Sequence, residues 1–149
     1  MHGRHARLSA LKTRRVRKAR TCVETPGLHH IVLTVSDPAR SRAFYQELLG
    51  FETHAMDGTP VPGFSFTVGG TDVYVLASYR PIKGDRFSEF RVGLDHLSFR
   101  APNEAALRAL AEKLLAAGVD TKGVERFPTG NLYIAFRDPD NVQLEYWLP

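Results

Sequence analysis

Residues 28–51 read LHHIVLTVSDPARSRAFYQELLGF, and this stretch contains the signals of one strand followed by one helix. Its opening part, residues 28–35, is rich in β-branched and apolar side chains, a composition typical of a β-strand. Ser36-Asp37-Pro38 then supplies an oxygen-bearing cap and a proline for the first turn of a helix that we expect over 39–49. Gly50 is suited to end that helix, because glycine readily adopts the conformation that closes a helix.

The same order of elements occurs twice along the chain. After the first helix, apolar runs separated by glycine and proline predict three strands, over 51–56, 63–68 and 72–78. The second copy is expected to have a strand over 94–99, a helix from about 102 to 117, and strands over 120–124, 131–137 and 142–148. Leu28 and His30 correspond to Leu94 and His96 with one offset of 66 residues, which indicates an internal duplication.

The duplication predicts an α+β fold made of two tandem βαβββ modules that form a curved, cup-like mixed sheet with the helices outside. One helix covers only one face of such a sheet, so a second module completes the structure around an interior. We expect the first repeat at about 27–79, a connecting loop at about 80–92 and the second repeat at about 93–149.

The net charge of +4 over 149 residues is unevenly distributed. Residues 1–25 contain eight Lys or Arg, one Glu and no aromatic residue, whereas 26–149 carry 12 Lys or Arg against 15 Asp or Glu. We therefore expect a basic, disordered leader over 1–25 and a folded domain over 26–149. A nucleic-acid-binding arm and an organelle transit peptide remain alternatives for the leader, and nucleic acid is not expected as a partner of the domain.

Two further features concern the compartment. The single cysteine, Cys22, excludes a disulfide framework and is typical of a reducing compartment. No apolar run approaches the roughly 20 residues that a membrane span needs. The sequence therefore predicts a cytoplasmic protein that does not enter a membrane.

Two histidines and one glutamate form a candidate metal site. His30 and His96 occupy equivalent positions in the two repeats, and Glu145 lies among apolar neighbours in the last expected strand. Two imidazoles and one carboxylate suit Fe(II), Mn(II) or Zn(II) and leave positions open for water or substrate. Taken singly, each residue also has an ordinary interpretation, as a packed strand histidine or as a charge that protects a sheet edge.

At this point three segments carry a family resemblance: residues 28–51 quoted above, GLDHLSF at 93–99 and FRDPDNVQLEYW at 136–147. Together they resemble the vicinal oxygen chelate superfamily, which includes glyoxalase I, extradiol dioxygenases, fosfomycin-resistance enzymes and bleomycin-binding proteins. The resemblance implies a divalent metal ion (Fe2+, Mn2+, Zn2+ or Ni2+) in the cup, held by His30, His96 and Glu145. It also implies a small substrate that chelates the metal through adjacent oxygens, and a homodimer or a cup formed within one chain.

The chain departs from the better-known members of that superfamily. Glyoxalase I takes a fourth metal ligand from the last strand of its first repeat, and the strand expected over 72–78 offers only Asp72 for this role. Extradiol dioxygenases have an acid-base histidine late in the first repeat, but this chain has no histidine between His54 and His96. Val32 and Ala135 stand where fosfomycin enzymes have threonine and tyrosine. Bleomycin-binding proteins lack the metal triad, which this chain keeps.

Several aromatic and basic residues are candidates for the remainder of the site. Tyr74 and Tyr133 are the candidate catalytic residues, because a phenol can orient an oxygen ligand or pass a proton. The candidates for substrate binding are Phe64, Phe66, Arg91 and Trp147, although ordinary core packing is an alternative role for each aromatic.

Two functions follow from these residues together with the resemblance. The leading hypothesis is a metal-dependent lyase, isomerase or ring-cleaving dioxygenase acting on a small oxygenated molecule. The alternative is a protein that binds an antibiotic or metabolite in the same cup without converting it.

Overall fold

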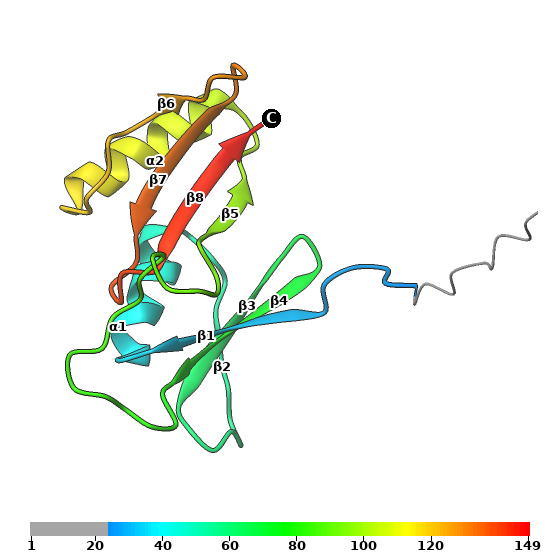
Figure 1. Cartoon of the computed structure of the whole chain (residues 1–149), viewed down its shortest axis with the longest axis vertical. Coiled ribbons are helices and arrows are strands. Elements are labelled where there is room, and N and C mark those ends of the chain that lie inside the picture. Colours follow the sequence, from blue (N-terminus) through cyan, green and yellow to red (C-terminus); the bar gives the residue numbers. More distant parts are fainter. Residues whose placement is uncertain (1–23) are drawn as a thin grey trace, which may run out of the picture.

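The computed structural model describes residues 24–149, whose strands form two four-stranded sheets (Figure 1). The predicted leader therefore falls almost wholly outside the described residues. The first module consists of β1 (His30–Val35), α1 (Pro38–Ala43), the π-helical turn η1 (Phe44–Leu48), β2 (His54–Ala55), β3 (Gly63–Val68) and β4 (Thr71–Ala77). The second consists of β5 (Leu97–Arg100), α2 (Glu104–Ala116), β6 (Glu125–Arg126), β7 (Leu132–Arg137) and β8 (Gln143–Leu148).

The two sheets have the same topology. Their strand orders are β1-β4-β3-β2 and β5-β8-β7-β6. The first strand of each module pairs in parallel with the last, and the other pairs are antiparallel. This confirms the α+β class and the duplicated module. The described residues form two separate hydrogen-bonded sheets, in each of which the first strand keeps one unpaired edge.

The predicted helix over 39–49 is α1 followed directly by η1. Asp37 caps it, because its Oδ1 accepts hydrogen bonds from the backbone N–H groups of Ala39 and Arg40. In η1 the N–H of Leu49 donates to the carbonyl of Phe44, a wider turn than the α-helix has. The wider turn allows two adjacent aromatic residues, Phe44 and Tyr45, to pack against the core.

Some strands differ from their expected bounds. β2 has only two residues where 51–56 was expected, and β6 lies just after the expected 120–124, in which Thr121 alone bridges to Phe136. Both strands lie at the outer edge of a sheet, so each has a single neighbour to pair with. β5 begins at Leu97, which places His96 just before the strand.

One core joins the two modules. The inward faces of both sheets and the apolar side of α2 meet around Tyr45, which is fully buried. Phe64 and Phe66 belong to this core: each is 1% exposed, and Phe66 stacks on Phe51 with ring centroids 4.4 Å apart. This packing corrects the expectation that the two phenylalanines line a substrate pocket. They face the helix side of their sheet, and alternation turns Ser65 between them to the opposite face.

Polar contacts between the modules centre on the turn between β7 and β8. The hydroxyl of Tyr45 donates to Oδ2 of the buried Asp138, at 3.1 Å. Asp138 Oδ1 accepts from the backbone N–H of Asp140 and of Val142, which fixes the turn. Asp140 accepts from both the backbone N–H and the hydroxyl of Ser36, at the end of β1. Burial raises the pKa of Asp138, and the same burial together with Asp138 raises that of Tyr45.

The segment that connects the modules is attached to the same turn. Arg137 donates two hydrogen bonds to the Glu89 carboxylate, at 3.0 and 2.5 Å. The N–H of Phe87 donates to the Asp140 carbonyl, and the Asn141 side chain donates to the carbonyl of Phe87. Asn141 has a φ of 70°, a left-handed conformation that asparagine tolerates better than most residues. No helix among residues 24–149 is both long and apolar enough to cross a membrane.

Replacing Tyr45 by phenylalanine should lower the free energy of unfolding by about 1–2 kcal/mol, because the buried Asp138 carboxylate loses a hydrogen-bond donor. Urea denaturation measures the effect. Tyr79→Phe is the matched control, since Tyr79 is exposed. Equal stabilities of the two variants would contradict a stabilising role for this contact.

A second prediction concerns acid stability. The hydrogen bonds from Arg137 lower the pKa of Glu89 from 4.5 to about 2. The stabilisation by Glu89 is therefore complete above about pH 4.5 and is lost as the pH falls toward 2. Thermal melts of Glu89→Gln should show a lower Tm than the wild type at pH 7, with a difference that shrinks below pH 4.5. Glu52→Gln, at an exposed position, should show neither effect.

Candidate functional site

His96 and Glu145 face each other in the second module. The His96 Nε2 lies 3.8 Å from Oε2 of Glu145. Glu145 is on β8 opposite Ser98 of β5, and its side chain is only 13% exposed. No described residue donates a hydrogen bond to this carboxylate. A largely enclosed carboxylate without a donor favours a cation beside it.

The other nitrogen of His96 already has a partner. Its Nδ1 lies 2.5 Å from Oδ1 of Asp95, the preceding residue. The carboxylate can only accept, so the ring donates from Nδ1 and directs Nε2 toward Glu145. Asp95 was not among the sequence candidates. The sequence feature that could have identified Asp95 is its position as a polar residue directly before a histidine that the repeat relates to His30.

His30 lies in the other sheet. It begins β1 on the exposed face, where its ring packs against that of Tyr74 with centroids 5.2 Å apart. Its Nδ1 lies 2.8 Å from the Nδ1 of His29. In residues 24–149 no three His, Cys, Asp or Glu side chains are close enough together to hold one metal ion. One chain thus brings His96 and Glu145 together but not His30.

The donor set is compatible with a divalent cation. An imidazole nitrogen and a carboxylate oxygen are both ligands of Zn, Mn and Fe(II), and their 3.8 Å separation is too long for a direct hydrogen bond. His96 and Glu145 therefore suit two of the three positions that the sequence suggested. His30, the third residue that the sequence suggested, lies outside this module.

Aromatic side chains extend the Glu145 face of the second sheet. Tyr133 on β7 stacks on Trp147 of β8, with centroids 5.7 Å apart, and the ring of Phe127 meets both edge-on. Partial burial, followed by the carboxylates of Glu125 and Glu145, raises the pKa of Tyr133. Its phenol therefore stays protonated at neutral pH and can donate a hydrogen bond. Tyr74 belongs to the His30 face, and its hydroxyl lies 3.5 Å from Asp72 Oδ2.

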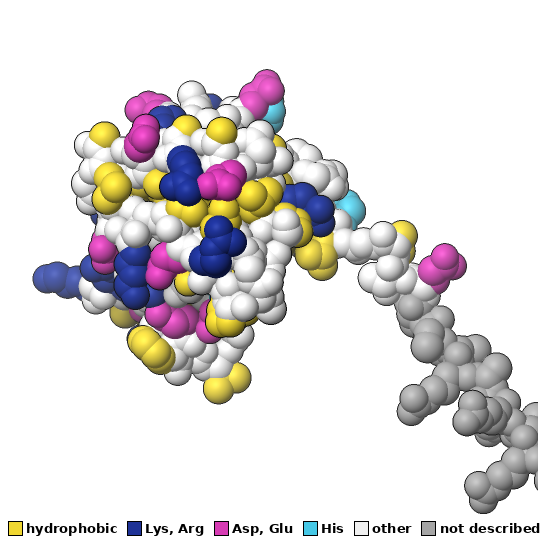
Figure 2. Space-filling model, turned by 90° about the horizontal axis from the view of Figure 1, so that it is seen from above, with side chains coloured by type: hydrophobic (Ala, Val, Ile, Leu, Met, Phe, Trp, Pro, Cys, Tyr) yellow, Lys and Arg dark blue, Asp and Glu magenta, His cyan; other side chains and the backbone are white. Residues whose placement is uncertain are grey.

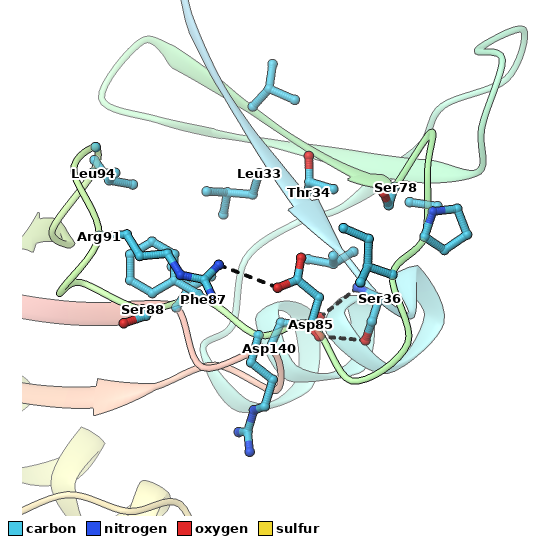
Figure 3. Close-up of a pocket in the computed structure, with 18 of the residues that line it drawn as sticks. Leu33, Thr34, Ser36, Ser78, Asp85, Phe87, Ser88, Arg91, Leu94 and Asp140 are labelled. Atoms are coloured by element: carbon cyan, nitrogen blue, oxygen red, sulfur yellow. Dashed lines mark hydrogen bonds and ion pairs between the residues drawn. The ribbon is translucent and has the colours of Figure 1, made fainter.

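A pocket of about 560 Å3 lies between β1 and the connecting segment (Figure 3). Its walls are mainly apolar and include Val32, Leu33, Ile82, Phe87 and Leu94. The Arg91 guanidinium points across it to Asp85, at 3.6 Å. Arg91 thus lines this pocket, whereas the other candidate site residues are not among its lining residues.

The surface around this pocket is unusually apolar. Large hydrophobic side chains are exposed at Val32, Ile82, Phe90, Val92 and Leu94. Figure 2 shows hydrophobic side chains that reach the surface between charged ones. Exposed apolar groups in such number are typical of a binding surface.

Comparison with known proteins agrees with this architecture. The uncharacterized protein YwkD of Bacillus subtilis is 30% identical over 126 residues, which cover 81% of this chain and 95% of YwkD. The crystal structure of a glyoxylase/bleomycin resistance protein/dioxygenase domain from Frankia sp. is 31% identical, with a TM-score of 0.75 and coverage of 84% of this chain and 98% of that one.

A lactoylglutathione lyase from Agrobacterium tumefaciens shares the fold alone. It is 20% identical, with a TM-score of 0.63 and coverage of 84% of this chain and 95% of that one. The model of the Glyoxalase/Bleomycin resistance protein/Dioxygenase superfamily matches residues 27–146, which are nearly the whole of the two modules. The chain therefore belongs to the Glyoxalase/Bleomycin resistance protein/Dioxygenase superfamily.

Proposed function

We propose that this protein is a metal-dependent enzyme that acts on a small oxygenated substrate, as a lyase, isomerase or ring-cleaving dioxygenase. The observation that carries the proposal is the pair formed by His96 Nε2 and the enclosed Glu145 carboxylate, 3.8 Å apart and without a hydrogen bond between them. Superfamily membership supports it, because the superfamily generally uses divalent metals. His30 is the third ligand in this proposal.

A second copy of the chain supplies His30. Within one chain this histidine lies on the first sheet, away from the His96–Glu145 pair. The exposed face that bears His30 and the face that bears Glu145 are each open, and β1 and β5 each have an unpaired edge. Placing the first module of one copy against the second module of another brings the three ligands together and covers exposed apolar side chains such as Val32 and Leu94.

The residues around the ligands have distinct chemical roles. A divalent ion, when bound, supplies Lewis-acid polarisation of substrate oxygens. Tyr133, with its raised pKa, holds a proton that it can donate to a substrate oxygen on the Glu145 face. Trp147 offers its ring as an apolar wall beside Tyr133. Tyr74 packs against His30 and limits the rotation of that imidazole.

The pocket beside β1 accommodates the apolar part of the substrate. Val32 lines it and lies on the same strand face as His30, two residues further along β1. A volume of about 560 Å3 is within the range of sites for small molecules. Arg91 forms an exposed ion pair with Asp85 and is available to a substrate carboxylate.

A binding protein without catalysis is the second candidate. The observation in its favour is that this pocket is lined by none of His30, His96 and Glu145. A ligand could therefore be enclosed there without contacting a metal. Ligand affinity that is the same with and without metal, and no product with any of the four metals, would favour this function over the enzyme.

Metal binding tests the ligand set. In calorimetric titrations with Zn2+ or Mn2+, His96→Ala and Glu145→Gln should each bind the ion at least about tenfold more weakly than the wild type, because each loses a donor atom. His54→Ala is the control, since His54 is an exposed histidine on β2. Wild-type affinity no greater than that of His96→Ala would contradict the metal-dependent function.

Mixing two variants that each lack one metal ligand tests whether a second copy of the chain supplies His30. His30→Ala and His96→Ala each lack one ligand, but a mixed dimer with shared sites contains one intact site. Random exchange should then restore about a quarter of the wild-type metal sites. The fraction is measured after unfolding and refolding the two chains together. No restoration, although mixed dimers form, would place all three ligands in one chain.

A further inference from the structure

The residues directly before the two histidines have the same relation to them. His29 precedes His30 and Asp95 precedes His96, with the offset of 66 residues that relates the repeats. In both cases a side-chain atom of the earlier residue lies at hydrogen-bond distance from Nδ1 of the histidine, at 2.8 Å for His29 and 2.5 Å for Asp95. The contact thus occurs twice, with different chemistry at equivalent places in the fold.

Such contacts do not arise from regular strand geometry. Neighbouring side chains in a strand point to opposite faces of the sheet, so residues i and i+1 do not normally meet. His29 lies just before β1, and both Asp95 and His96 lie just before β5. The chain therefore approaches each first strand in a form that turns the earlier side chain onto the ring of the histidine.

We propose that Asp95 and His29 are positioning residues, each of which holds Nδ1 of the following histidine so that Nε2 is presented to the metal ion. The inference rests on the proposed metal-dependent function. Asp95 has the more definite role, because a carboxylate accepts hydrogen bonds and places the ring hydrogen of His96 on Nδ1. The lone pair is then on Nε2, the nitrogen that faces Glu145.

His29 holds His30 in a weaker way. A neutral imidazole can donate or accept at Nδ1. Either His29 or His30 can therefore be the donor of the hydrogen bond between the two Nδ1 atoms. The backbone of His29 is fixed, since its carbonyl accepts from the N–H of Asp72 on β4. The ring of His30 is also bounded by Tyr74. His29 and Tyr74 together orient the ring of His30, whereas Asp95 both orients the ring of His96 and selects the tautomer of His96.

The two partners also differ in charge. Asp95 places a carboxylate next to His96, and its negative charge favours a cation bound at Nε2. His29 adds none when neutral. We therefore expect the Asp95 substitution to weaken metal binding more than the His29 substitution.

The experiment uses the full chain and two measurements. Nitrogen-15 NMR of the histidine rings in the metal-free protein identifies the tautomer of His96, and calorimetry with Zn2+ gives the affinity. Asp95→Ala should convert His96 partly to the Nε2–H tautomer and weaken Zn2+ binding by about 10–100-fold. Asp95→Asn retains an acceptor oxygen and should keep the Nδ1–H tautomer and most of the affinity. His29→Ala should weaken binding less, with recovery in His29→Gln.

Asp57→Asn and His54→Gln are the matched controls, at exposed positions on or just after β2, the strand at the opposite edge of the first sheet from β1. An unchanged tautomer and unchanged affinity in Asp95→Ala would overturn the proposal, as would equal losses in Asp95→Ala and Asp95→Asn without a change of tautomer. If the wild type binds no Zn2+, Mn2+, Fe2+ or Ni2+, the proposed function fails. The tautomer of His96 in Asp95→Ala then still decides whether Asp95 positions the ring.

Discussion

The relative placement of the two modules depends on one buried polar joint. Tyr45 donates to Asp138, and Asp140 accepts from both hydrogen-bonding groups of Ser36. Burying two carboxylates in an apolar interior is unfavourable unless donors surround them, and here the donors come from both modules. Separating the modules would take the Tyr45 donor from Asp138 and the Ser36 donors from Asp140. The joint therefore selects one arrangement among the many that apolar contact alone would permit.

Because the modules are duplicates, each has one uncovered sheet face and an unpaired edge on its first strand. A helix covers one face of each sheet, while the other face and the edge of the first strand stay open. The joint occupies the helix side, so both open faces remain available for a ligand or another chain. The candidate site residues lie on these open faces. They are His30 and Tyr74 on the first sheet, and Glu145, Tyr133 and Trp147 on the second.

The fold was largely predictable because duplicated periodic patterns reinforce each other. The edge strands β2 and β6 and the turn η1 were not, because pairing with a single neighbour and the burial of both Phe44 and Tyr45 depend on tertiary packing. Alternation within β3 could not tell which face is the core, so Phe64 and Phe66 were misplaced. The family resemblance implied that His96 and Glu145 share a site, and the two side chains do lie 3.8 Å apart. The partners of Nδ1 were not foreseen, because they depend on backbone just outside the strands.

The pocket beside β1 has walls of different origin. One wall is a strand of the first module, and the opposite wall is a segment that Glu89 and Phe87 attach to the β7–β8 turn of the second. The width of the pocket therefore depends on the relative position of the two modules. A ligand that touches both walls binds only to the docked arrangement. Its binding energy then adds to the energy that keeps the halves together, and ligand affinity and module docking become thermodynamically linked.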